Sequence, residues 1–501
     1  MPPPNLLKEI RNKGLEHSLA EADRLAYSRD CSSASMIRLR GGEVEILPKI
    51  IVWPKNNQEV STLLALANTH QMPVVPYGAG SGVCGGAIPI HKGIVLDLKK
   101  MDQILFLDEK NLRVRAQCGI LGEILERELN RKGYTLGHFP SSIYTATLGG
   151  YLACRSAGQL STKYGKIEDL FHSMKVVLAT GGVVDCSRDK EAWFSELILG
   201  SEGTLGVVTE AELHVRPLPE KRKYVGFQFE SVAQGLEAIR LFMQKGFRPA
   251  VVRLYDPLDS FIFSTHPSRE KNNSSFSFIP EKIFSFLGFA KWNSLQMLLL
   301  QPSLLNKAID FALKKSLLIL GFEGAAWKLD HELLGVQQIC KREGGKSLGE
   351  APGLQWLKRR YSVSYKMSPL VNQGFFVDTM EVASSWTNLA KLYEGVKSAI
   401  GQEALVMAHF SHAYHDGCSI YFTFLGHALG KEKTLKQHRR VWDKGMEASL
   451  KAGGTISHHH GIGTLKAEAF VQELGPLYAW WKNAKAVLDP QAILNPGKMG
   501  L

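Results

Sequence analysis

Short apolar runs alternate with amphipathic segments through most of the chain. From about residue 46, apolar residues recur at helical spacing in 56–70, after the N-cap-like Asn56, and in 120–133, which ends at Gly133. Further short apolar runs predict strands at 51–54, 94–98, 104–108 and 112–119, and a hairpin at 173–186 that turns at Gly181–Gly182. This alternation predicts an α/β fold with α+β character.

A break in composition divides the pattern into two domains. Pro217 and Pro219 precede a charged stretch at 220–223, which is typical of a boundary. Strands and helices alternate again beyond it. We predict an N-terminal helical segment 1–45, a first domain 46–218, a cap domain 219–450, and a C-terminal segment 451–501 that returns to the first domain.

The composition is that of an ordinary soluble globular protein. The chain has 501 residues, of which 45% are hydrophobic and 22% charged, and a formal net charge of +12 at pH 7. The positive charge favours anionic partners, while the lack of zinc-finger spacing or aromatic RNA-binding motifs argues against nucleic acid. Seven scattered cysteines without CxxC pairs indicate reduced thiols and a cytoplasmic setting.

The strongest chemical signal is a loop with five glycines in nine residues. An apolar strand runs directly into this loop, and the glycines are Gly78, Gly80, Gly82, Gly85 and Gly86. Without Cβ atoms, successive backbone N–H groups form a concavity that binds anions such as a pyrophosphate.

Two other structures would also explain this loop. Gly80, Gly82 and Gly85 fit the dinucleotide pattern G-x-G-x-x-G, with Asp97 as the ribose-binding acid. That pattern requires a helix to start within the loop, and Pro89 and Gly93 break any helix there. A glycine-rich hairpin without a ligand is the second alternative.

Two further segments, 140–170 and 200–210, offer small residues at close spacing. Their hydroxyl groups and amides carry little bulk, as a flat ring or a diphosphate lying on the backbone requires. Each segment alone is equally well explained as a glycine-rich turn.

In this order and spacing, the three segments resemble the vanillyl-alcohol-oxidase type (PCMH-type) of FAD-binding domain across residues 46–218. The resemblance implies a two-subdomain FAD-binding domain followed by an α+β substrate cap. Family members that tether FAD to a histidine near the first loop need one there, and none occurs between Pro76 and Pro89, so we predict noncovalent FAD. The implied cofactor-binding residues are Pro76, Tyr77, Gly78, Ala79, Gly80, Ser81, Gly82, Val83, Ser142, Thr147, Gly149, Gly150, Ser156, Gly158, Glu202, Gly203 and Val208.

Three adjacent histidines, His458, His459 and His460, stand out in the C-terminal segment. On one strand or helix they cannot all face the same way, which poorly suits joint ligation of a metal ion. Two of them could serve as an acid/base and its orienting partner, because imidazole titrates near neutrality; surface histidines beside a helix cap are the alternative. The string SHHHGIG resembles SHHHGxG of alkyldihydroxyacetonephosphate synthases, the ether-lipid branch of this flavin family.

The likeness to this branch extends over the second domain. AVVRLYD resembles its arginine-bearing strand, and GCSIYFTF resembles its tyrosine-bearing strand. The resemblance implies that Arg253 binds substrate and that Tyr421 and the three histidines are catalytic; a surface salt-bridge arginine and a core tyrosine are the structural alternatives. The implied reaction replaces the acyl chain of acyl-dihydroxyacetone phosphate with a fatty alcohol, through an adduct at flavin N5 and without net redox change.

The chain departs from that branch in two places. Met367–Ser368 stand where the synthases carry an Arg-Asp pair that helps to bind the substrate phosphate. Lys366 and Arg360 are the substitute candidates, although lysine offers a point charge rather than a fork. The C-terminal LNPGKMGL looks more like the D-lactate and glycolate oxidoreductase branch, and it has no SKL-type peroxisomal signal.

That second branch supplies the alternative function, hydride transfer from a 2-hydroxy acid to FAD. Its metal-dependent members use a histidine pair and a glutamate before the late HGIG, but here His459 replaces the glutamate and Tyr421 replaces the second ligand. His409, His412 and His415 remain a candidate metal site of another kind, although the leading prediction contains no metal. A flavin-binding scaffold without catalysis is a third class.

Residues 275–315 are dense in Phe, Leu and Trp, with interspersed lysines and no clean period. They form either an insertion packed on the cap or a patch in which apolar residues enter lipid and lysines meet anionic head groups. We therefore predict an anionic, lipid-like small molecule as substrate, peripheral membrane contact through 275–315, and a homodimer. The N-terminus lacks the apolar core of a secretory signal, so we expect a cytoplasmic location, at most peripheral on the inner membrane face.

Overall fold

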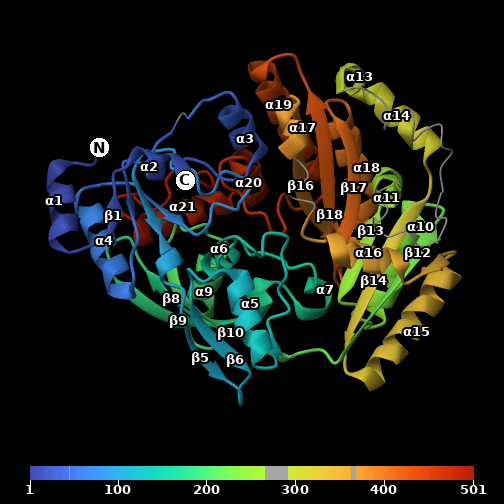
Figure 1. Cartoon of the computed structure of the whole chain (residues 1–501), viewed down its shortest axis with the longest axis horizontal. Helices are drawn as coiled ribbons and strands as arrows, with labels where there is room; N and C mark the ends of the chain where they lie inside the picture. Colours follow the sequence, from blue (N-terminus) through green and yellow to red (C-terminus); the bar gives the residue numbers. More distant parts are fainter. Residues whose placement is uncertain (45, 266–291, 363–367) are drawn as a thin grey trace. The chain divides into compact units, whose positions relative to one another are not determined.

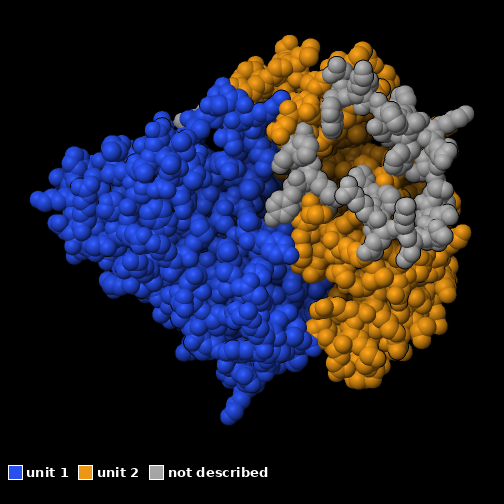
Figure 2. All heavy atoms as spheres, in the orientation of Figure 1, with its two compact units in different colours: residues 1–218, 456–501 blue, residues 219–455 orange. Residues whose placement is uncertain are grey.

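Two units make up the chain in its computed structural model, which describes residues 1–44, 46–265, 292–362 and 368–501. Unit 1 comprises Met1–Leu218 and Ile456–Leu501, and unit 2 comprises Pro219–Thr455 (Figure 2). The N-terminal segment therefore belongs to the same unit as 46–218, and unit 2 is inserted before the last part of unit 1.

Unit 1 begins with a four-stranded sheet in the order β1-β2-β4-β3, preceded and interrupted by helices (Figure 1). The side chain of Asn56 caps α4 by accepting a hydrogen bond from Glu59 N at 2.9 Å, and the helix buries Val60, Leu63 and Leu64. The helix predicted over 56–70 is confirmed. The elements are α1 (Pro4–Asn12), β1 (His17–Ser18), α2 (Glu21–Ala26), α3 (Ser33–Arg40), β2 (Ile50–Val52), α4 (Asn57–Thr69), β3 (Val74–Tyr77) and β4 (Ile94–Asp97).

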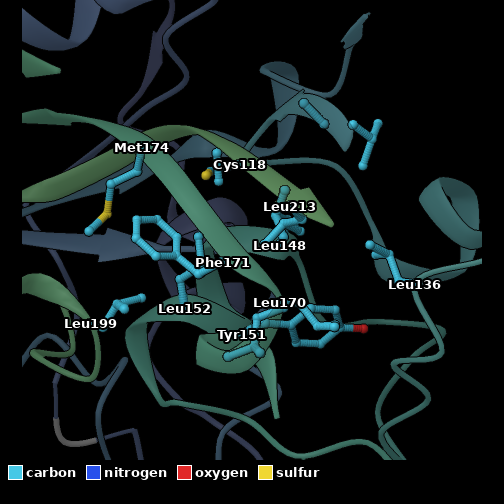
Figure 3. Packing of buried hydrophobic residues seen from close by; sticks show 14 of the residues in the cluster. Cys118, Leu136, Leu148, Tyr151, Leu152, Leu170, Phe171, Met174, Leu199 and Leu213 are labelled. Atoms are coloured by element: carbon cyan, nitrogen blue, oxygen red, sulfur yellow. The ribbon is translucent and has the colours of Figure 1, made fainter. Parts of the chain in front are cut away.

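A five-stranded antiparallel sheet follows in the order β5-β6-β10-β8-β9. The predicted hairpin is confirmed, because Leu178 N donates to Gly182 O at 2.8 Å across its turn. Helix α6 packs on this sheet in a buried apolar cluster that includes Leu148, Leu152 and Phe171 (Figure 3). The elements are β5 (Ile104–Asp108), β6 (Arg113–Gln117), α5 (Gly122–Arg131), β7 (Tyr134–Thr135), α6 (Leu148–Ala153), α7 (Ser161–Tyr164), α8 (Ile167–Leu170), β8 (Phe171–Val177), β9 (Val183–Ser187), α9 (Ala192–Ile198), β10 (Val207–His214) and β11 (Arg216–Pro217).

The C-terminal segment completes unit 1 with α20 (Ala467–Leu474), α21 (Leu477–Leu488) and a final stretch of turns. Val74 N of β3 donates to Ile493 O at 2.7 Å, and Asn495 N donates to Val74 O at 2.7 Å. The buried Lys485 Nζ also donates to Thr204 O at 2.7 Å. Residues near the end of the chain thus hydrogen-bond to the strand that leads into the glycine loop.

Unit 2 contains one antiparallel seven-stranded sheet in the order β15-β12-β14-β13-β17-β18-β16 (Figure 1). Its strands are β12 (Lys221–Phe229), β13 (Val251–Tyr255), β14 (Ser316–Gly324), β15 (Lys346–Gly349), β16 (Phe375–Ser385), β17 (Leu405–Ala413) and β18 (Gly417–His427). Its helices are α10 (Val232–Gln244), α11 (Pro257–Ser264), α13 (Trp292–Leu298), α14 (Pro302–Ala312), α15 (Ala326–Arg342), α16 (Ala351–Arg359), α17 (Ser368–Asn372), α18 (Trp386–Gly401) and α19 (Lys431–Lys451).

The two faces of this sheet differ in chemistry, because side chains alternate along each strand. One face is apolar and is covered by α18 and α19, as the ring contacts of Tyr393 with Phe410 and of Trp442 with Phe424 show. The other, which we call the polar sheet face, carries in register the side chains of Arg253, Tyr255, His409, Ser411, Ser419, Tyr421 and Glu381. Because burying polar side chains costs free energy unless they are hydrogen-bonded, such a face indicates a functional site.

The hydrophobic stretch 275–315 is only partly described, since 275–291 lie outside the described residues. In α13 and α14, Met297, Leu304 and Phe311 are exposed, with Phe311 at 85%. Within the described ranges, no helix combines the length and the hydropathy needed to cross a bilayer.

Candidate active site

The first glycine loop of unit 1 presents a row of backbone donors. Across 78–83, no backbone N–H donates to a protein acceptor within the part of the chain that the structure describes. The loop is held from outside instead: Lys99 Nζ donates to Gly78 O at 2.8 Å, Cys31 N to Gly82 O at 2.9 Å, and Gly85 N to Asp30 Oδ2 at 2.7 Å. Six consecutive available amides fit the paired phosphates of a dinucleotide.

The dinucleotide pattern that requires a helix here is excluded. Residues 82–93 contain no helix, and β4 follows them directly. Asp97, which that pattern assigns to a ribose, is buried and accepts hydrogen bonds from Tyr27, from Trp53 Nε1 at 3.0 Å and from Lys99 Nζ at 2.7 Å. Its carboxylate is therefore occupied by hydrogen bonds within the protein at the end of β4.

The three predicted flavin segments meet in unit 1. A Cβ at Gly78 would overlap the hydroxyl of Thr147, the N-cap of α6, and a Cβ at Gly203 would lie 2.9 Å from Pro76 Cγ. These glycines allow the backbones of the first loop, the 147–150 turn and the 200–208 segment to approach one another. Sequence alone predicted the segments, and the structure brings them together.

The remaining predicted cofactor residues support this arrangement. Gly149 N donates to Cys118 O at 2.8 Å and Gly150 N to Thr147 Oγ1 at 3.3 Å. Ser156 Oγ lies 2.8 Å from Nε2 of the buried His138. The others lie nearby in sequence: the Ser142 carbonyl accepts from Ala146 N, Gly158 packs against Phe139 N, and Val208 pairs with Val176 between β10 and β8.

Glu202 joins this region to the histidine loop. Its carboxylate accepts hydrogen bonds from Ile462 N and, at 2.8 Å, from Gly463 N. Burial raises the pKa of Glu202, while these two amides oppose the shift. Asn495 Nδ2 donates to Glu202 O at 2.7 Å. The side chain of Glu202 thus holds the 461–463 turn in unit 1, and its role in binding the cofactor stays a prediction.

The three histidines lie in that loop as a chain of imidazole contacts. His458 Nδ1 and His459 Nδ1 are 2.9 Å apart, and the rings of His459 and His460 meet edge to face at 4.6 Å. Because a hydrogen bond needs one donor and one acceptor, one of the two Nδ1 atoms carries the proton and the other accepts it. His458 and His459 therefore form a pair that shares a proton.

In unit 2, the polar sheet face brings Arg253 and Tyr421 to one histidine. An Nη of Arg253 donates to His409 Nε2 at 2.6 Å, and the His409 ring stacks on Tyr421 at 5.0 Å and 14°. The other ring nitrogen of His409, Nδ1, lies 3.1 Å from Asp259 Oδ2. Sequence reasoning placed Arg253 and Tyr421 at the site but assigned no role to Asp259.

The charges fix the tautomer of His409. Guanidinium only donates hydrogen bonds, so His409 Nε2 must accept, and Nδ1 then carries the proton and donates a hydrogen bond to Asp259 Oδ2. Burial and the charge of Arg253 lower the pKa of His409, which keeps the ring neutral. Burial also raises the pKa of Tyr421, so its phenol stays protonated at neutral pH.

The other predicted residues of unit 2 have different surroundings. The guanidinium of Arg360 lies 4.5 Å from the ring centre of Tyr361, whereas Lys366 lies outside the described residues. His412 sits at a β-bulge with φ +52°, and His415 is exposed in the turn after β17. In the described ranges, no cluster of three or more His, Cys, Asp or Glu side chains suits a metal ion.

Asp259 gives a pH-dependent prediction. Burial raises its pKa from 3.8 to about 7, against the opposing charge of Arg253. Between these values the folded protein binds more protons than the unfolded chain, so this residue lowers stability as pH rises from about 4 to about 7. The free energy of unfolding of Asp259→Asn should therefore exceed that of the wild type by a margin that grows with pH, up to about 4 kcal/mol. The difference in thermal midpoint between the two proteins, followed over this pH range, measures this margin.

The exposed Asp443, which pairs with Arg439 at 2.7 Å, provides the matched control. The same measurement on Asp443→Asn gives the effect of replacing an exposed carboxylate, against which the result for Asp259→Asn is compared. A margin for Asp259→Asn that does not change with pH would contradict the raised pKa.

Comparison with known proteins identifies the family. Residues 48–187 match the model of an FAD binding domain, and residues 218–499 match the model of the C-terminal domain of FAD linked oxidases. The chain belongs to the FAD-linked oxidases, which confirms the predicted fold class and the PCMH-type resemblance. It is an enzyme of this flavoprotein family, with FAD as its cofactor.

Particular relatives come from both predicted branches. Alkyldihydroxyacetonephosphate synthase of Dictyostelium discoideum is 30% identical over 99% of this chain and 80% of that protein, and the one of Trypanosoma brucei brucei is 32% identical over 92% and 75%. Glycolate oxidase subunit GlcD of Bacillus subtilis is 25% identical over 96% and 93%. A solved structure of alkyldihydroxyacetonephosphate synthase matches with a TM-score of 0.78 and 28% identity, covering 99% of this chain and 85% of that one.

Proposed function

We propose that this protein exchanges the acyl chain of an acyl-dihydroxyacetone phosphate for a fatty alcohol. The observation that carries the proposal is that the similarity to proteins named alkyldihydroxyacetonephosphate synthase extends over nearly the whole chain. The identity is 28–32% over 92–99% of the chain. The local features agree with it, since the SHHHGIG loop lies in the flavin-binding unit and Arg253 and Tyr421 share one sheet face.

The residues divide the chemistry between them. Bound FAD supplies an isoalloxazine ring that accepts and returns electron density, and its phosphates would lie on the amides of 78–83. Arg253 holds the anionic head group through its guanidinium. The Tyr421 phenol, protonated because burial raises its pKa, would donate a hydrogen bond to the carboxylate oxygen of the departing fatty acid. The His458–His459 pair takes a proton from the hydroxyl group of the incoming alcohol.

The molecule also has features that suit a lipid-like substrate. The net charge of +12 attracts anionic head groups, and the exposed Leu304 and Phe311 of α14 lie near Lys307 and Lys314 in the sequence. We include in the proposal peripheral contact with a membrane surface, a cytoplasmic location, a homodimer and noncovalently bound FAD.

The test is an exchange assay. Purified FAD-loaded protein is incubated with acyl-dihydroxyacetone phosphate and labelled hexadecanol, either in detergent or in vesicles of anionic phospholipid. We expect label in an ether-linked phosphate and one fatty acid released per label, with higher turnover in the vesicles. Absence of labelled ether product would contradict the transferase, and equal rates in both media would contradict the membrane contact.

A second function, oxidation of a 2-hydroxy acid, is favoured by the similarity to the GlcD subunit of glycolate oxidase. In that case Arg253 would hold the carboxylate and a histidine would take the hydroxyl proton, while bound FAD would supply the hydride acceptor. Anaerobic mixing with D-lactate or glycolate distinguishes the two functions, because only the oxidoreductase would bleach the oxidised flavin spectrum.

A further inference from the structure

Arg253 and Ser411 are neighbours across β13 and β17 on the polar sheet face. They are paired residues in the antiparallel register, so their Cβ atoms lie about 4.5–5.5 Å apart on the same side of the sheet. Arg253 Nε and Ser411 Oγ are both buried, and neither has a hydrogen-bond partner among the described residues. Two buried polar atoms without partners, on residues that are neighbours across the sheet, are costly unless a ligand completes them.

A neighbouring serine shows that the sheet can satisfy such a group internally. Ser419, opposite Ser411 on β18, donates its hydroxyl proton to Ser411 O at 2.8 Å. Ser411 Oγ has no such bond although only 4% of the residue is exposed. Its hydroxyl is therefore available beside the guanidinium.

The orientation of Arg253 is already fixed on another side. One Nη donates to His409, whose Nδ1 proton points to Asp259, and Asp259 is anchored on α11. This chain of contacts directs the guanidinium without using Nε. A pre-oriented donor loses less conformational entropy when it binds a ligand.

We propose that Arg253 Nε and Ser411 Oγ form an oxyanion subsite for the substrate head group, with Asp259 and His409 as positioning residues. The ligand is an oxyanion, either a phosphate monoester or a carboxylate, that accepts one hydrogen bond from each atom. Ser411 thereby supplies a contact that this chain needs because Met367–Ser368 replace the Arg-Asp pair of the synthase branch. The assignment of this oxyanion to a substrate rests on the proposed function.

Binding of unreactive anions to the FAD-loaded protein tests the subsite without turnover. Calorimetric titration with glycerol 3-phosphate and, in a separate arm, with pyruvate, the product of D-lactate oxidation that cannot reduce the flavin, gives Kd for each anion. Ser411→Ala should weaken binding of the preferred anion about tenfold, whereas Ser411→Thr, which keeps the hydroxyl, should stay within about threefold. Arg253→Lys, which removes the Nε–H donor but keeps the charge, should weaken binding at least as much as Ser411→Ala.

Ser449→Ala is the matched control, because Ser449 is equally buried but its hydroxyl donates to Gly445 O at 2.8 Å within α19. Wild-type affinity in Ser411→Ala, an equal loss in Ser449→Ala, or no measurable binding of either anion to the wild type overturns the subsite. Binding of pyruvate alone, with the expected dependence on Ser411, supports the subsite and refutes the proposed transferase. The two failures are therefore distinguishable.

Discussion

Replacement of Tyr421 by phenylalanine is expected to lower kcat by about 10²–10³-fold, the usual contribution of a positioned hydrogen-bond donor to a developing negative charge. The hydroxyl lost lies on the polar sheet face, where Thr379 Oγ1 donates to it at 3.3 Å and the neutral His409 ring stacks beside it. Because burial raises the pKa of Tyr421, the phenol keeps its proton at neutral pH. Steady-state turnover in the exchange assay measures the effect, and the flavin spectrum should stay that of the wild type.

Tyr393 offers the control for losing a buried phenol. Its hydroxyl donates to Asp256 Oδ2 at 3.2 Å on the other, helix-covered side of the sheet. Tyr393→Phe should lower the thermal midpoint but leave kcat within about threefold, since a lost buried hydrogen bond costs about 1–3 kcal/mol of stability. A Tyr421→Phe variant that behaves in the same way would show that Tyr421 is only a core residue.

Replacement of Gly80 by alanine is expected to reduce FAD retention about tenfold or more. Gly80 has φ +62°, a left-handed conformation that costs an L-residue about 1–2 kcal/mol, which corresponds to about tenfold in binding. Its new methyl group would also overlap the hydroxyl of Tyr77, which donates to Arg29 O at 3.3 Å. The ratio of flavin to protein absorbance after gel filtration, followed by titration with FAD, measures the loss.

Gly395→Ala controls for the substitution itself. Gly395 lies within α18, and a Cβ there would meet no atom of the described residues within 4 Å. Alanine at that position should retain FAD fully and raise stability by about 0.5–1 kcal/mol. Full flavin occupancy in Gly80→Ala would refute the assignment of this loop to the diphosphate.

The local elements were predictable because their signals lie within a few residues. The helix over 56–70 follows from apolar spacing and from Asn56, and the 173–186 hairpin follows from its two glycines. The order of the glycine-rich segments was also sufficient to predict the class of FAD-binding domain. Glycines are required wherever the backbone must approach a ligand closely, so their positions mark the ligand-binding loops in the sequence.

The partners that fix the site could not be predicted in the same way. His409 receives its orientation from Asp259, which lies 150 residues away in the sequence. The local sequence DPLDS at 256–260 indicates only the start of a helix, and α11 does begin there. Likewise, Asp30 holds Gly85 N from a segment that the sequence marks only as polar. Which buried groups meet is decided by strand register and packing, and neither leaves a local pattern.

The hydrogen bonds between β3 and the final residues have a consequence for biosynthesis. The strand that feeds the glycine loop precedes unit 2 in the chain, but its partners Ile493 and Asn495 follow unit 2 and are synthesised only after it. In a nascent chain, the first part of unit 1 therefore cannot complete its folding until the whole of 219–455 has been synthesised. Premature termination at or before residue 457 removes the hydrogen-bond partners of that strand together with the histidine loop, so a truncated product should accumulate as a cofactor-free polypeptide and a substrate for proteolysis.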